Sequence, residues 1–147
     1  MTNSVKFSRL MAIIMVAIVC CSGCKKDKNG DSGGGSGKLA PPAWIQGAWG
    51  AAPGGVGEEV YKFTSNDVLM SGVSLKTLAV STPYATVTIS ESKKTDNLYE
   101  ITMKVKATGS ETVSGFWSFK KGDGTYIEFG ADETGATEVE YGRLYKR

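Results

Sequence analysis

The middle of the chain reads Tyr99-Glu100-Ile101-Thr102-Met103-Lys104-Val105-Lys106-Ala107, with apolar residues at the odd positions and polar residues at the even ones. A period of two is typical of a half-buried antiparallel β-strand, whose successive side chains point to opposite faces of a sheet. Residues 84–91 alternate in the same way, and Val87 and Ile89 are predicted to point inward. This region therefore predicts a sheet with one face buried and the other in water.

The same period continues outward in both directions, and turn residues such as Ser71-Gly72 and Gly122-Asp123-Gly124 separate the segments. Strands at roughly 8–12-residue spacing, without a significant helix after the N-terminal region, predict an all-β fold. Short turns favour an antiparallel up-and-down barrel, because closure removes exposed edges. We predict eight or nine strands, since the third and fourth segments form either one kinked strand or two: 43–51, 57–64, 66–71, 73–80, 84–91, 97–107, 112–121, 124–130 and 136–146.

The chain has 147 residues, a formal net charge of +2 and no histidine. Without histidine it lacks the commonest general base and the commonest metal ligand. Glu138 and Glu140 share one face of a predicted strand, which is typical of a solvated surface. We therefore expect no catalytic residue, no metal site and no cofactor. The predicted domain has no basic patch, so we expect no nucleic-acid partner.

The N-terminal region has the pattern of a signal peptide. Lys6 and Arg9 precede an apolar run over residues 10–19, which is too short to span a bilayer. The following Cys21-Ser22-Gly23-Cys24 resembles the lipobox of bacterial lipoproteins, although Cys21 stands where that family usually has leucine. The resemblance implies that residues 1–23 are removed and that Cys24 is acylated, which anchors the protein in a membrane. The alternative is cleavage elsewhere, which leaves a soluble protein.

Residues 25–38 contain no apolar side chain and are rich in glycine, serine and lysine. Such a segment cannot bury enough surface to offset its conformational entropy. We therefore predict a disordered tether over residues 24–42 and a folded domain over residues 43–147. In the lipoprotein family an aspartate directly after the cysteine favours inner-membrane retention. Lys25 occupies that position, so the resemblance implies the outer membrane, in either leaflet.

Gly47-Ala48-Trp49 lies on the first predicted strand of the domain, and this position resembles the Gly-x-Trp of lipocalins. In that family the tryptophan closes one end of the barrel, and an arginine on the last strand packs across its ring. Arg143 would be that arginine, since residues 137, 139, 141, 143 and 145 share one face of the last predicted strand. The alternative is that Trp49 is an ordinary core residue and Arg143 lies in solvent.

The inward positions of the predicted strands carry bulky side chains. An eight-stranded barrel is just wide enough to be filled by side chains or to hold one small ligand. The resemblance favours a lipid-anchored protein that binds a small hydrophobic ligand inside the barrel. The alternative is a packed barrel that binds an envelope protein or a glycan through exposed aromatics such as Tyr84 or Phe116. The candidate interior residues are Phe63, Ile101, Met103, Trp117, Phe119, Phe129 and Tyr141.

Overall fold

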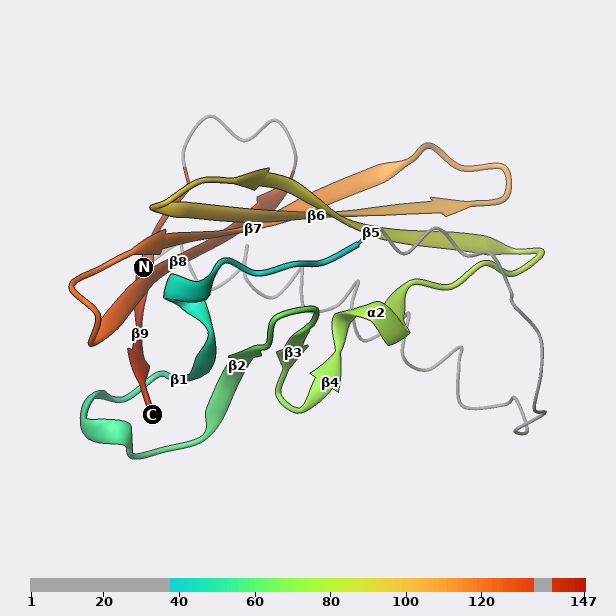
Figure 1. Cartoon of the computed structure of the whole chain (residues 1–147). Coiled ribbons are helices and arrows are strands. Elements are labelled where there is room, and N and C mark those ends of the chain that lie inside the picture. The colour runs from blue at the N-terminus through green and yellow to red at the C-terminus, as the bar shows by residue number, and fades with distance from the viewer. Residues whose placement is uncertain (1–37, 134–138) are drawn as a thin grey trace, which may run out of the picture. The chain divides into compact units, whose positions relative to one another are not determined.

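The computed structural model describes residues 38–133 and 139–147, all of which belong to the unit Gly34–Arg147. The predicted signal peptide, Cys24 and the tether as far as residue 37 lie outside the described residues. The described part is nearly all β and consists of one nine-stranded antiparallel sheet (Figure 1). The predicted fold class is confirmed.

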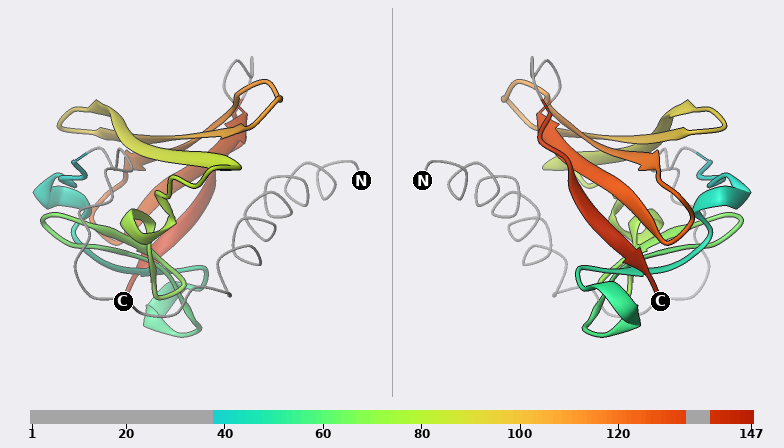
Figure 2. Two further views of the ribbon diagram at one scale, coloured as in Figure 1. Left: turned by 90° about the vertical axis from the view of Figure 1, so that its right-hand side faces the viewer. Right: turned by 90° about the vertical axis from the view of Figure 1, so that its left-hand side faces the viewer.

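The strands follow one another as a meander, except that the first strand pairs with the last. The sheet order is β4-β3-β2-β1-β9-β8-β7-β6-β5, which is the order of an up-and-down barrel left open between β4 and β5. The sheet curls strongly on itself (Figure 2). The strands are β1 (Gly47–Gly50), β2 (Glu59–Phe63), β3 (Val68–Met70), β4 (Val73–Ser74), β5 (Ala85–Lys94), β6 (Leu98–Ala107), β7 (Val113–Lys121), β8 (Tyr126–Glu133) and β9 (Gly142–Lys146).

The alternating stretch forms the long β5–β6 hairpin, as predicted. Ile89 lies opposite Met103, and both are buried on the inner face together with Ile101. Lys104 is exposed on the outer face, opposite Thr88. The pairing shifts by one residue between Glu91 and Lys93, which marks a β-bulge. The period-two pattern therefore gives the correct inner and outer faces over nearly the whole hairpin.

The predicted strand 73–80 is wrong beyond its first two residues. The strand β4 ends at Ser74, and the helical turn α2 (Leu75–Leu78) follows. Leu75 and Leu78 are three residues apart, so a helical turn puts them on the same side, whereas a strand would put them on opposite faces. Leu75 is buried in the core. The edge of the sheet at β4 is consequently very short.

The predicted strand 136–146 is also shorter than expected, because β9 begins only at Gly142. The preceding Val139, Glu140 and Tyr141 lie against Gly130 of β8, where an added Cβ would be 2.5 Å from Val139 Cγ1. Gly130 pairs with Ser118 of β7, whose side chain accepts a hydrogen bond from the Tyr141 hydroxyl at 3.0 Å. This segment therefore crosses the outer face of the sheet, at a place where glycine leaves room for it.

The segment 39–46 runs between the β5–β8 part of the sheet and strands β2 and β3 (Figure 1). Leu39, Pro41 and Ile45 are buried, and residues Ala43–Ile45 form a 3-10 turn. The Ala40 N–H donates to Glu91 Oε2 at 3.0 Å, which ties the segment to β5. Among the described residues, buried contacts are thus present from Leu39, four residues before the predicted domain boundary. Within the described ranges, no helix is long and apolar enough to cross a membrane.

Candidate functional site

Five aromatic rings meet inside the curled sheet, and we call them the aromatic cluster. Tyr61 and Phe63 come from β2. The other three rings, Tyr99, Phe119 and Phe129, come from β6, β7 and β8, which lie across the interior from β2. Tyr61 lies 5.2 Å from Phe119 and 5.1 Å from Phe129 between ring centroids. Phe63 lies 4.9 Å from Phe119 and 6.4 Å from Tyr99. These separations are typical of favourable aromatic contacts, so the two sides of the sheet touch directly through their rings.

The cluster contains three of the predicted interior residues, namely Phe63, Phe119 and Phe129. Ile101, Met103 and Trp117 also lie on the inner face and are buried. Phe119 is 0% exposed, and Phe129 is half-buried. Six of the seven candidate residues therefore lie on the inner face, and their role in binding a ligand stays a prediction. The structure adds that their rings contact one another across the barrel.

Tyr141 is the seventh candidate, and its predicted interior position is wrong. Its hydroxyl reaches Ser118, whose position on β7 belongs to the outer face of the sheet. Lys120 Nζ lies over the Tyr141 ring at 3.7 Å from the centroid. The prediction put Tyr141 and Arg143 on the inner face of the last strand, whereas Leu144 faces inward in β9, so these odd-numbered residues lie on the outer side. Tyr141 thus covers Ser118, which is fully buried although it is on the outer face.

Trp49 is buried at β1. Its indole Nε1–H donates to the Ile45 carbonyl oxygen at 2.7 Å, which fixes the ring against the segment 39–46. Gly47 has a positive φ of 123°, a conformation that favours glycine. An added Cβ at Gly47 would lie 3.8 Å from Lys146 Cε.

The structure does not bring Arg143 to Trp49. Arg143 is exposed on the outer face, where its guanidinium carbon lies 4.4 Å from the Tyr126 ring centroid. Lys146 lies opposite Trp49 in the β1–β9 register, with its Nζ 5.9 Å from the indole centroid. The reason is the phase of β9, in which Leu144 faces inward and Arg143 therefore faces outward. A cation does lie over Trp49, but it comes from lysine.

The Tyr99 hydroxyl is buried without a hydrogen-bond partner in the described part of the chain. Burial raises the pKa of Tyr99 above its usual range, and the nearby charge of Glu91 raises this pKa further. Burial also raises the pKa of Tyr61. Both phenols are therefore neutral at physiological pH. The Glu91 carboxylate lies close enough to the hydroxyl to raise this pKa, but the hydroxyl makes no hydrogen bond of good geometry within the described residues, so its desolvation is poorly compensated.

Replacing Tyr99 by phenylalanine is expected to raise the free energy of unfolding by about 1 kcal/mol, since it removes this hydroxyl and keeps the ring. Urea denaturation of the wild-type protein and the variant measures the change. Tyr126→Phe is the control, because Tyr126 is only half-buried. A clear loss of stability in Tyr99→Phe would show that the hydroxyl is paired in solution.

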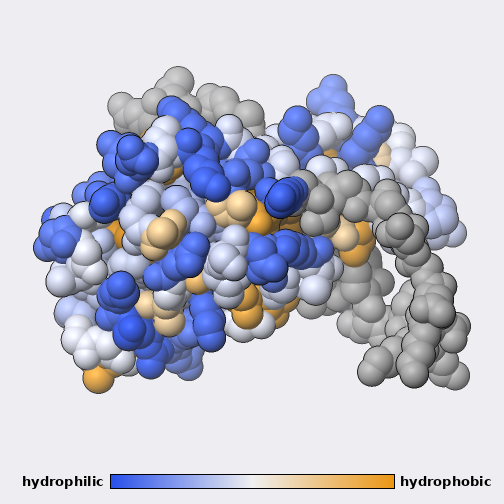
Figure 3. Space-filling view, viewed as in Figure 1, coloured by the Kyte–Doolittle hydropathy of each residue, from blue (hydrophilic) through white to orange (hydrophobic). Residues whose placement is uncertain are grey.

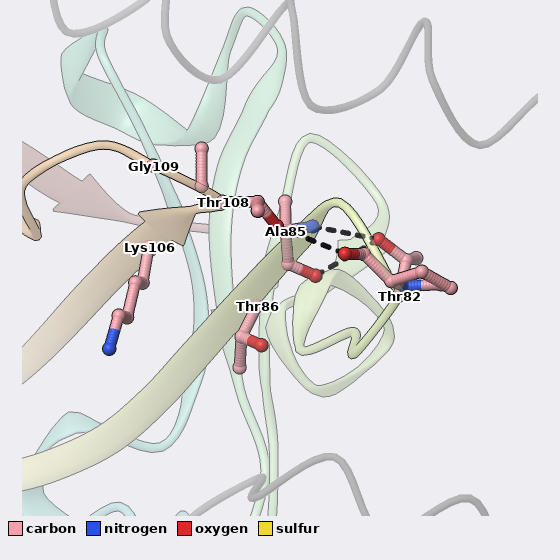
Figure 4. A pocket seen from close by; sticks show the side chains of 8 residues that line it. Thr82, Ala85, Thr86, Lys106, Thr108 and Gly109 are labelled. Carbon is pink, nitrogen blue, oxygen red and sulfur yellow. Dashed lines mark hydrogen bonds between the residues drawn. The ribbon is translucent and has the colours of Figure 1, made fainter.

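A pocket of about 410 Å³ lies at the end of the β5–β6 hairpin, away from the aromatic cluster (Figure 4). Thr82 and Thr108 help to build it, and their hydroxyls bond to backbone carbonyls of residues 83–85. Lys106 and Thr86, which are paired on neighbouring strands, are directed to the same side. Tyr84 adjoins this pocket in sequence and is 80% exposed. None of the predicted interior residues lines the pocket.

The described residues contain no group of three or more His, Cys, Asp or Glu side chains placed to hold a metal ion. Asp123 lies in the turn between β7 and β8 and accepts from the Thr125 hydroxyl and N–H at 2.6 and 2.8 Å. These hydrogen bonds lower the pKa of the Asp123 carboxyl. Its role is therefore the local one of shaping a turn.

Sequence reasoning missed Lys146 and Ser118. Leu144 and Lys146 are two residues apart in β9 and therefore point to the same face. An inward Leu144 would have indicated that Lys146 also lies on the inner face. Ser118 carries no sequence signal, because its burial depends on the distant Tyr141.

No known protein family matches the chain, and comparison with curated proteins and with solved structures also finds no match.

Proposed function

We propose that the protein is a lipid-anchored interaction module of the cell envelope, whose packed barrel binds an envelope protein or glycan through its outer surface. The observation that carries this proposal is the contact of Tyr61 and Phe63 with Phe119 across the interior. A ligand inside the barrel would have to separate the rings of Tyr61, Phe63 and Phe119, which already bury one another.

Energetics favour the packed interior over the carrier function. Burying one large apolar side chain contributes about 1.5–3 kcal/mol, and well-oriented aromatic pairs add about 0.5–1.5 kcal/mol. Phe119 alone makes ring contacts with Tyr61, Phe63 and Phe129. A small apolar ligand that displaced these rings would have to replace all of those contacts.

The anchoring part of the proposal rests on Cys21-Ser22-Gly23-Cys24 and the apolar run before it. Acylation at Cys24 would hold the protein at the membrane, because each buried CH₂ contributes about 0.8 kcal/mol. Lys25 after the cysteine favours the outer membrane. The polar residues that follow would separate the domain from the lipid surface.

The outer surface offers Tyr84 as a contact residue. Its large amphipathic ring is 80% exposed beside the hairpin pocket. Tyrosine is enriched at binding surfaces, because one ring supplies both apolar area and a hydroxyl. We propose no catalytic role, which agrees with a sequence that has no histidine.

Photocrosslinking in living cells tests this function. A photoreactive amino acid at position 84 is expected to give a covalent adduct with an envelope component. The same amino acid at position 62, which is exposed on β2, is the control and is expected to give little or none. Equal adducts from both positions would contradict a specific outer contact. A shift of tryptophan fluorescence on adding palmitate would instead support binding inside the barrel.

A further inference from the structure

The outer face of β5, β6 and β7 carries a group of hydroxyl side chains that we call the hydroxyl face: Thr86, Thr88, Ser90, Thr102 and Ser114. The strand register arranges it in rows. Thr86 pairs with Lys106, and Thr88 pairs with Lys104, which in turn pairs with Ser114. The third row runs from Ser90 through Thr102 to Phe116. Lys104 thus lies between hydroxyl residues of two neighbouring strands, and Lys106 lies beside Thr86 on one side.

These hydroxyls make no hydrogen bond within the described part of the chain. Other hydroxyls of the protein do: Thr82, Thr95 and Thr108 all bond to backbone groups at turns. Branching at Cβ favours threonine in strands, but this reason does not extend to Ser90 and Ser114. The hydroxyl face is therefore a polar surface whose bonding capacity is open to a ligand.

Lys104 and Lys106 are exposed, and neither forms an ion pair with any described residue. The first two rows contain no carboxylate. The nearest carboxylate along the third row is Asp132, which already interacts with another group of the chain. Two unpaired ammonium groups among hydroxyls favour an anionic ligand that also carries hydroxyls.

The spacing of the face fits an extended ligand. Neighbouring strands are about 4.8 Å apart, and residues on one face of a strand repeat about every 6.8 Å. Donors therefore recur in two directions over three strands. The half-buried ring of Phe116 adds an apolar surface at the end of the third row. A chain of sugar rings offers matching hydroxyls, carboxylates and apolar ring faces.

We propose that the hydroxyl face, with Lys104, Lys106 and Phe116, binds an acidic polysaccharide that carries carboxylates on its sugar rings. This inference rests on the proposed function and names its partner as a glycan. A lipid surface fits less well, because insertion requires exposed apolar anchors and Phe116 is half-buried. Polar residues also predominate on the face of the protein seen in Figure 3, where apolar residues form small separate spots.

Calorimetric titration of the full chain in detergent micelles tests the proposal, with polygalacturonate and alginate as probes and neutral dextran as the reference. We expect both acidic polymers to bind and dextran to bind at least about tenfold more weakly, with affinity falling as salt rises. The double variant K104Q/K106Q is expected to weaken acidic binding at least about tenfold. The variant T88V/T102V keeps the shape of the side chains and should weaken binding several-fold.

The matched control is K62Q/K121Q, which removes the same charge from two exposed lysines elsewhere and should leave affinity unchanged. Unchanged melting temperatures would show that all variants are folded. Absence of acidic binding, equal loss in both double variants, or tighter binding of dihexanoylphosphatidylglycerol would overturn the proposal. Crosslinking from position 84 does not depend on the hydroxyl face. Adducts retained there, without glycan binding, would contradict this inference and leave the proposed function standing.

Discussion

Replacing Phe119 by alanine is expected to lower the free energy of unfolding by about 3–5 kcal/mol. The Phe119 side chain is 0% exposed, and its ring lies within 5.3 Å of three other rings between centroids. Truncation removes the buried surface and leaves a cavity at the centre of the aromatic cluster. Urea denaturation followed by tryptophan fluorescence measures the loss.

Tyr84→Ala is the control for this experiment, because Tyr84 is 80% exposed and its truncation should change stability by no more than about 0.5 kcal/mol. A cost below about 1 kcal/mol for Phe119→Ala would contradict the tight packing described above. It would mean that the interior already contains space beside Phe119. The carrier function would then regain support.

Replacing Leu39 by alanine is expected to lower the free energy of unfolding by about 2–5 kcal/mol. Leu39 is 1% exposed, although it directly follows the polar tether. Its neighbour Ala40 is held by Glu91 and by Lys94, whose Nζ donates to the Ala40 carbonyl at 2.5 Å. Leu39 is therefore part of the core and not of the tether.

Lys38→Ala is the matched control, because Lys38 is exposed one residue earlier and should change stability by no more than about 0.5 kcal/mol. The same denaturation measurement applies to both variants. Equal, small effects of Leu39→Ala and Lys38→Ala would place the domain boundary near residue 43. A large effect of Leu39→Ala alone would place it between residues 38 and 39.

The sequence predicts the long hairpin best, because its side chains alternate regularly except at the bulge between Glu91 and Lys93. Over residues 98–107 one face is buried against the core and the other meets water, so periodicity records burial directly. Short elements contain too few residues for a period to be recognised. The segment Leu75–Leu78 is a single helical turn, and its leucines are also compatible with the strand that was predicted over residues 73–80. Its conformation is decided by tertiary packing.

The candidate site also contains residues that the sequence predicts and residues that it does not. The inner residues Phe63 and Phe119 follow from alternation within strands that the structure retains. Arg143 and Tyr141 lie on the outer face because Leu144 faces inward, and residues 139–141 lie outside the sheet, where Gly130 of another strand leaves room for them. Such a long-range steric condition is not visible in local sequence. The hydroxyl face likewise appears only when three strands are placed side by side.

The most direct test of the packed interior is native mass spectrometry of the full-length protein, extracted in detergent from the cells that normally make it. We predict the mass of the acylated chain alone, with the same mass before and after denaturation. A small apolar molecule that co-purifies and is released on unfolding would contradict the packed interior and would identify the protein as a carrier.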